Sequence, residues 1–446
     1  MPLLPTGYYL MGGATAVATS FLLLAFVPPR FVDRLAKARL QFGSTAAVTP
    51  VPVSVASFLL LALLLLTGLY GSRDPLANPL PTMVWTVWWV GITLLHALFG
   101  NLWAYINPWT GPYRLMDRGL GGRLSRSPPL SYPDWLGYWP AIAFFFAFAW
   151  FELVDPAPDD PERLAYAVAG YCLLTLAGMV LFGEAAWRDR AEPFSILYRL
   201  IGGLSPLVIG PSGVRMRRYD VSFALPGAAL IERSALPPSG VLFVLLTLSA
   251  VSFDGLSSTF WWLGLTGINP LEFPGRTEVM GRNTVGLLMT VLVLGAGFGG
   301  AIRLGRFLAG ERAPMAPGLG VFIYSIIPIA IAFQFSHYLP ALLINAQYAV
   351  IALSDPFATG ADLFGLDQMH VTTSFMATYE GTRMMWNLQT AGIVVGHMAA
   401  VVLAHALAVR QFGDNRQAVL SQLPLAILMV LYTALGLWLL STPVAS

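Results

Sequence analysis

Long apolar runs repeat along the whole chain. A bilayer core about 30 Å thick needs roughly 20 apolar residues of helix to cross it, and we count ten runs of about that length. They lie near residues 7–27, 52–71, 82–105, 135–154, 164–183, 239–263, 284–302, 319–340, 384–409 and 419–441. The pattern predicts an all-α fold, a polytopic integral membrane helix bundle in which 1–446 is a single transmembrane domain.

Basic residues alternate between the connections. After spans one, three, five, seven and nine the Lys and Arg counts are four, four, seven, three and two. After spans two, four, six and eight they are one, one, two and one. Cytoplasmic connections hold the excess of Lys and Arg, so we expect both termini on the periplasmic, or outer, side.

The longest cytoplasmic connection, 184–238, contains two distinct pieces. The stretch from Pro193 to Ile201 is amphipathic, and the stretch from Ile209 to Arg218 is punctuated by Gly and Pro. We expect the first piece to lie in the plane of the membrane interface and the second to form a short hairpin whose arginines lie at the headgroups.

The eighth span contains two prolines. Its apolar character continues over 319–353, which as one helix is about 52 Å long and too long for a single crossing. Pro328 and Pro340 should break it, so 341–383 is expected to be a re-entrant or loop segment on the outer side. We expect Trp85, Trp88 and Trp89 to anchor their span at the membrane interface.

Composition excludes several classes of protein. Of the 446 residues 56% are hydrophobic and only 11% are charged, whereas soluble domains carry about 25% charged residues. The single cysteine, Cys172, excludes a disulfide framework and an iron–sulfur cluster held by cysteines. A net charge of +2 without a basic patch argues against nucleic acid as a partner.

Ionisable side chains inside the spans are the main functional candidates, because burying them in a membrane is costly. They are Asp254, His337, His397, His405 and His96. Counting 1.5 Å per residue places four of them between the midplane and the outer face, whereas His405 lies deeper. Two amides, Gln334 and Gln389, lie in the same spans or beside them.

Several chemistries fit these residues. Asp254, His337 and His397, with or without His96, have the ligand types suited to zinc or non-haem iron. Four residues could support such a site by hydrogen-bonding to its ligands or by relaying protons: His405, Gln389, Gln334 and His96. Haem b is a weaker alternative, with His96 and His397 as axial ligands. The same groups could instead relay protons, or simply hold the helices together. Gly396 beside His397 should let a neighbouring helix approach closely.

Three stretches carry a family resemblance. They run from Pro133 through Trp150 to Leu153, from Ser354 to Gly365, and across the pair His397 and His405. From about Asn107 onward the chain resembles a family of bacterial multi-span membrane proteins, some of which are labelled fenitrothion hydrolase. The resemblance implies a bacterial inner-membrane location and hydrolysis of an organophosphate ester. It also favours Asp254, His337 and His397 as the site over the haem pairing.

Three functions follow as alternatives. The leading one is a metal-dependent membrane hydrolase, open to the outer side, that acts on an apolar ester. The second is a transporter, a permease coupled to protons or ions. The third is an accessory subunit that binds a partner in a membrane respiratory complex.

Overall fold

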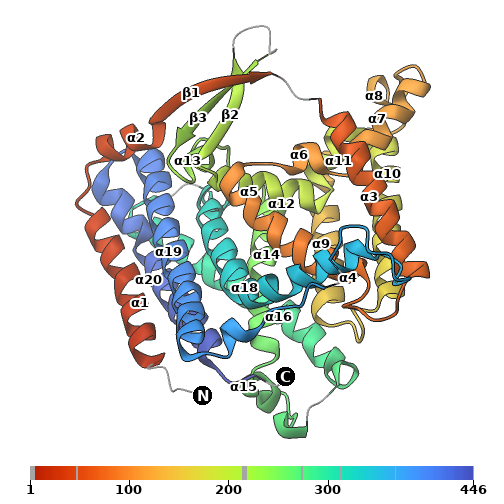
Figure 1. The fold of residues 1–446 in the computed structure, drawn as a ribbon. Coiled ribbons are helices and arrows are strands. Elements are labelled where there is room, and N and C mark those ends of the chain that lie inside the picture. Colours follow the sequence, from red (N-terminus) through yellow and green to blue (C-terminus); the bar gives the residue numbers. More distant parts are fainter. Residues whose placement is uncertain are drawn as a thin grey trace.

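The computed structural model describes residues 6–46, 49–212, 218–272, 275–311, 314–366 and 368–444. Within these residues, ten helices are long and apolar enough to span a membrane, which confirms the predicted helix bundle. An even number of crossings places both termini on one side, and Figure 1 shows them close together at one end of the bundle. The spans are α1 (Thr6–Leu24), α3 (Pro50–Tyr70), α4–η1–α5 (Pro79–Thr82, Met83–Ile92, Thr93–Phe99), α9 (Trp139–Leu153), α10 (Pro161–Phe182), α14 (Pro238–Ser257), α16 (Arg276–Leu308), α17–η5–α18 (Met315–Phe322, Ile323–Ile326, Ile327–Ser354), α19 (Tyr379–Phe412) and α20 (Asn415–Ser441).

Short elements fill the connections. One of them, the 3-10 turn η2 (Asp134–Leu136), leads into α9 and completes the fourth span, Asp134–Leu153. The others are α2 (Pro29–Lys37), α6 (Trp103–Ile106), α7 (Thr110–Gly119), α8 (Arg123–Arg126), α11 (Glu184–Arg190), α12 (Pro193–Ile201), η3 (Gly202–Leu204), α13 (Ala228–Ile231), α15 (Phe260–Leu265), η4 (Pro270–Glu272) and η6 (Ser374–Met376). Capping side chains mark where two of the long helices begin: Asp160 accepts from the Arg163 N–H at the start of α10 and Asp414 accepts from the Gln417 N–H at the start of α20.

A small antiparallel sheet lies at the end of the molecule opposite the termini (Figure 1). The strands β2 (Leu207–Ser212) and β3 (Arg218–Ala224) form the predicted hairpin, whose turn lies outside the described residues. β1 (Arg39–Ala46) pairs with the other edge of β3, giving the order β1-β3-β2. We did not predict β1; its Phe42 ring stacks on Phe223 of β3, at 5.0 Å between centroids.

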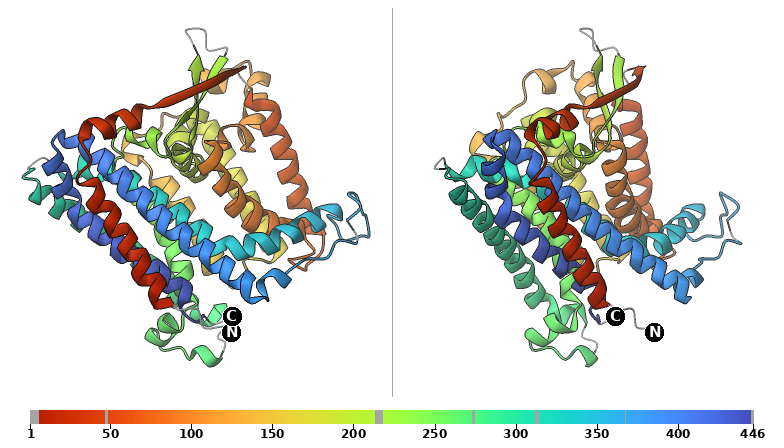
Figure 2. Two further views of the ribbon diagram at one scale, coloured as in Figure 1. Left: turned by 60° about the vertical axis from the view of Figure 1, so that its left-hand side comes forward. Right: turned by 90° about the vertical axis from the view of Figure 1, so that its left-hand side faces the viewer.

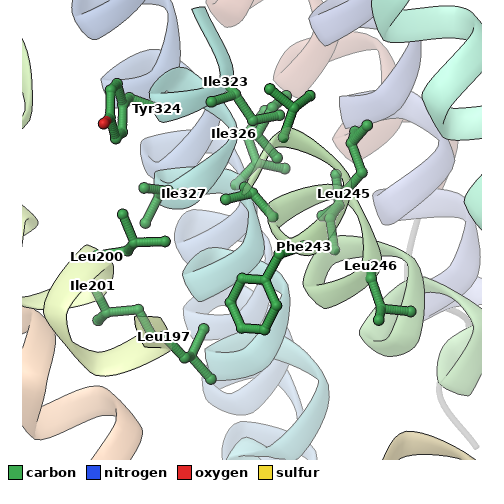
Figure 3. Close-up of a cluster of buried hydrophobic side chains, with 14 of the residues drawn as sticks. Leu197, Leu200, Ile201, Phe243, Leu245, Leu246, Ile323, Tyr324, Ile326 and Ile327 are labelled. Atoms are coloured by element: carbon green, nitrogen blue, oxygen red, sulfur yellow. The ribbon is translucent and has the colours of Figure 1, made fainter. Parts of the chain in front are cut away.

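The helix α12 lies in the core and not in the membrane interface where we expected it. All of its residues except Arg199 are buried. Its apolar side chains pack against α14 and the start of α18, as Figure 3 shows for Leu197, Leu200, Phe243 and Ile327. The same periodic pattern serves an interfacial helix and a core helix, so only the packing distinguishes them.

The eighth span also differs from its expectation. α18 continues as one helix through Pro340 to Ser354, and the non-α turn is η5, directly before Pro328. Residues 341–354 therefore extend the helix rather than forming a re-entrant segment, and the described residues between α18 and α19 contain only the short 3-10 turn η6. In the views of Figure 2, α18 and α19 lie side by side along most of their length.

Prediction one concerns the contact of α16 with α20. A Cβ atom on Gly305 would lie 1.8 Å from the Ser421 carbonyl oxygen, whereas a Cβ on Gly299 of the same helix would meet nothing within 4 Å. Gly305→Ala should therefore lower the free energy of unfolding by about 1–3 kcal/mol, and Gly299→Ala should not lower it. Thermal unfolding in detergent measures both; equal stabilities would contradict the close approach.

Candidate functional site

Four polar side chains from three helices meet near one end of the bundle. His337 Nε2–H donates to Asp254 Oδ2 over 2.9 Å. The Tyr338 hydroxyl lies 2.5 Å from the same Asp254 oxygen and 2.9 Å from Glu152 Oε1. Glu152 is on α9, Asp254 is on α14, and His337 and Tyr338 are on α18. We call this set the carboxyl–tyrosine cluster.

The geometry of the cluster limits how its hydrogen bonds can share protons. Two hydrogen bonds meet at the Tyr338 oxygen, but a phenol supplies only one hydrogen. Both contacts are hydrogen bonds at the same time only when one carboxyl is protonated and donates to that oxygen. Because Asp254 Oδ2 already accepts from His337, the arrangement assigns the carboxylate to Asp254 and the carboxylic acid to Glu152. The resulting chain runs from Glu152 through Tyr338 to Asp254, with His337 at its end.

The cluster is shallow and partly accessible. Asp254 lies three residues, roughly 5 Å, before α14 ends at Ser257, because this helix stops six residues earlier than the sequence suggested. The side chains of His337 and Asp254 are 34% and 21% exposed. Arg276, at the start of α16, donates to the backbone carbonyls of Glu152 and Asp155 over 2.9 and 3.3 Å. The neighbouring Asp155 is paired with Arg163 at 2.6 Å.

His397 is separate from the carboxyl–tyrosine cluster. It is fully buried, its Nδ1–H donates to the Ile393 carbonyl over 2.8 Å, and its Nε2 has no partner among the described residues. Its ring lies 6.1 Å from Phe333, one helical turn before His337, and 6.0 Å from Tyr432.

The reason for this separation lies on α14. Ser252 hydrogen-bonds to Tyr432 beside His397, whereas Asp254, two residues later, faces Tyr338 and His337. Two residues turn an α-helix by about 200°, so Ser252 and Asp254 lie on opposite faces. Asp254 and His397 were expected at a similar depth in the membrane, but they lie beside different faces of α14 and do not meet.

The predicted ligand set is consequently not assembled. No group of three or more His, Cys, Asp or Glu side chains that could hold a metal occurs in the described part of the chain. Asp254 and His337 meet, but His397 does not join them. For the haem pairing, His96 offers no free ring nitrogen, because its Nδ1–H donates to the Ile92 carbonyl at 2.6 Å and its Nε2 accepts from the Trp103 N–H at 2.9 Å. Both ring nitrogens of His96 are thus engaged in hydrogen bonds to the backbone.

Two more candidates lie away from the cluster. His405 is 1% exposed and its Nδ1 lies 3.3 Å from Gln422 Nε2, on α20. Gln334 donates to the Trp89 carbonyl over 3.3 Å and lines a cavity of about 30 Å³. Neither touches Asp254 or Glu152 in any described contact, so their predicted supporting role at a metal is not realised here.

Gln389 has a structural role that we did not predict. Pro340 has no N–H, so it leaves the Ser336 carbonyl without its helical donor. Gln389 Nε2 donates to this carbonyl over 2.7 Å, and the Ser336 hydroxyl donates back to the Gln389 carbonyl over 2.7 Å. The exchange lets α18 continue through Pro340 in an environment without water.

Sequence reasoning missed Glu152 and Tyr338. Glu152 is the only acidic residue within the predicted fourth span, at 135–154, and this position was the available signal. Tyr338 gave no signal of its own, because its role depends on two partners from other helices. Of the tryptophans expected at the interface, Trp89 is buried in the core, whereas Trp85 and Trp88 are half-buried and line a cavity.

Comparison with known proteins adds no identification. No protein-family model, no curated protein and no solved structure matches this chain.

Prediction two tests the proton on Glu152. At neutral pH we expect the infrared C=O stretch of a protonated carboxylic acid, because the Tyr338 oxygen needs a second hydrogen. The band should disappear in Glu152→Gln and persist in Glu278→Gln, which removes an exposed carboxyl from the first turn of α16. A band that is unchanged in Glu152→Gln would contradict the assignment.

Prediction three tests the exchange between Gln389 and Ser336. Gln389→Ala leaves a buried carbonyl unpaired, so the free energy of unfolding should fall by about 1–3 kcal/mol. In a Pro340→Ala background the restored N–H can satisfy Ser336, and the same substitution should cost less. Thermal unfolding of the four proteins gives the coupling; purely additive effects would contradict the compensation.

Proposed function

We propose that this protein is a proton-coupled permease and that the carboxyl–tyrosine cluster is its proton-binding site. The observation that carries the proposal is the hydrogen-bonded chain in which two carboxyl groups share one tyrosine hydroxyl beside a histidine. Ionisable groups inside membrane helices are typical of proton relays. Here they come from α9, α14 and α18, so a change in their charge acts on the contacts between three spans.

The chain supports a balanced proton transfer. Glu152 gives its proton to the Tyr338 oxygen while Tyr338 gives its own to Asp254 Oδ2, so the phenol is neutral before and after the step. The negative charge moves from Asp254 to Glu152, toward Arg276 and away from His337. His337 then loses its charged acceptor, which weakens the contact between α14 and α18. Solute binding could use this difference between two states.

The metal-dependent hydrolase remains the second function. Its support is the family resemblance, and the ligand set that it requires is not assembled among the described residues. Asp254 and His337 provide two neighbouring ligand types, one fewer than the three protein ligands usual for catalytic zinc. Elemental analysis of the purified protein separates the two functions, since only the hydrolase requires a stoichiometric metal.

Prediction four tests the proton-coupled permease. Protein in liposomes with a trapped pH indicator is exposed to a panel of apolar esters and organic ions. We expect a change of internal pH that requires both the protein and one class of solute. Asp254→Asn should reduce this change at least tenfold, because a neutral amide cannot take up the proton from Tyr338.

The matched control is Asp33→Asn, which removes an exposed carboxylate that pairs with Lys37 at 3.2 Å far from the cluster in sequence. It should transport like the wild type. Full transport in Asp254→Asn would contradict the proposal. So would stoichiometric zinc or iron together with ester hydrolysis that is lost in His337→Ala.

A further inference from the structure

The short helix α2 lies at the end of the bundle that carries the sheet, opposite the termini (Figure 1). The first span, α1, ends at Leu24 and α2 begins at Pro29. The turn between them is held against the bundle, because Asn415 Nδ2 at the start of α20 donates to the Ala25 carbonyl over 3.0 Å. Four connecting residues reach at most about 14 Å even when fully extended. α2 therefore lies at or near the headgroup layer of the membrane that α1 crosses.

The side chains of α2 fall into three sectors around the helix axis, at about 100° per residue. Val32 and Ala36 are half-buried, on the side that packs against the bundle at α19 and α13. Phe31 and Leu35 form the next sector and are 52% and 38% exposed. The remaining sector carries only charged side chains, all of them exposed: Arg30, Asp33, Arg34 and Lys37.

The exposed apolar sector needs a cover that the protein does not supply. None of the residues of α2 is buried, and an isolated helix of fewer than about 12 residues is marginal in water. Leu22 and Leu23, in the last turn of α1, are 60% and 65% exposed, so the surface that span one presents to lipid continues directly to α2. The nearest apolar material for Phe31 and Leu35 is thus the hydrocarbon beside α1. A helix with this order of sectors lies in the plane of the interface.

The charged sector has a net positive charge. Lys37 pairs with Asp33 at 3.2 Å, which leaves the guanidinium groups of Arg30 and Arg34, and neither of these pairs with a carboxylate in the described part of the chain. The two arginines are one helical turn apart on the same side of α2. Guanidinium groups match phosphate oxygens in geometry and charge. The charge therefore complements an anionic headgroup, and a free phosphate ion would leave the apolar sector uncovered.

We propose that α2 is a docking helix for anionic phospholipids at this end of the bundle. Phe31 and Leu35 lie among the acyl chains, while Arg30 and Arg34 bind the phosphates at the headgroup level. The lipid thereby stabilises the turn between α1 and the strand β1. This inference is independent of the proposed transport, because the carboxyl–tyrosine cluster lies on α9, α14 and α18.

Prediction five locates the apolar sector with a bimane label on the full chain in liposomes. Cys172, the single native cysteine, is buried, so Leu35→Cys and Asp33→Cys each take one label, and the unsubstituted chain gives the background. A phospholipid with a nitroxide on its acyl chain should quench the label at 35 at least threefold more strongly than the label at 33, because the two positions are about 200° apart. Equal quenching at both positions would overturn the proposed orientation, and a label at 35 that no lipid reaches would show that a protein covers the sector instead.

The same label at 35 tests the choice of headgroup. Nitroxide phosphatidylglycerol should reach half-maximal quenching at a mole fraction about fivefold lower than nitroxide phosphatidylcholine. Substituting Arg30→Gln together with Arg34→Gln should remove this preference. The matched control, Arg118→Gln with Arg123→Gln, removes two exposed basic residues from α7 and α8 at the same end of the bundle and should keep it. Equal quenching by the two lipids, or a preference that survives the loss of both α2 arginines, would overturn the proposal.

Discussion

The close antiparallel contact between α18 and α19 sets the geometry on which the candidate site depends. A Cβ on Gly396 would lie 2.2 Å from that of Ala332, and one on Gly392 would lie 2.6 Å from the Phe335 ring, so glycine alone permits this approach. The exchange between Gln389 and Ser336 fixes the register of the two helices. With this register, His337 and Tyr338 point toward α14 and α9, while His397 lies one turn away in an apolar setting.

The absence of water in the bilayer core determines how the bundle pairs its polar groups. In hydrocarbon an unpaired donor or acceptor has no water to bind, so Glu192 collects four donors, His96 uses both nitrogens, and the carbonyl freed by Pro340 receives an amide. The carboxyl–tyrosine cluster differs from these fully paired groups. In the carboxyl–tyrosine cluster two carboxyl groups share one phenol, which can donate to only one of them.

Much of the fold was predictable, because crossing a membrane requires long apolar runs whose number can be counted directly. The errors arose where one pattern serves two environments. The amphipathic Pro193–Ile201 helix is buried and not interfacial, and α18 continues through a proline that normally ends a helix. For the site, scarcity of charge selected Asp254 and His337 correctly as neighbours. It also selected His397 on α19. This residue lies beside Phe333, one turn before His337 on α18, and near the face of α14 opposite to Asp254.

The sequence by itself determined that the chain is a ten-helix membrane bundle and that few ionisable groups lie within it. These properties follow from local hydrophobicity, which does not depend on how the helices pack. Only the tertiary structure decided which polar groups meet, because side chains two residues apart on a helix lie on nearly opposite faces. That step separates Ser252 beside His397 from Asp254 beside Tyr338 and Glu152, and it changes the candidate from a metal centre to a proton-binding chain.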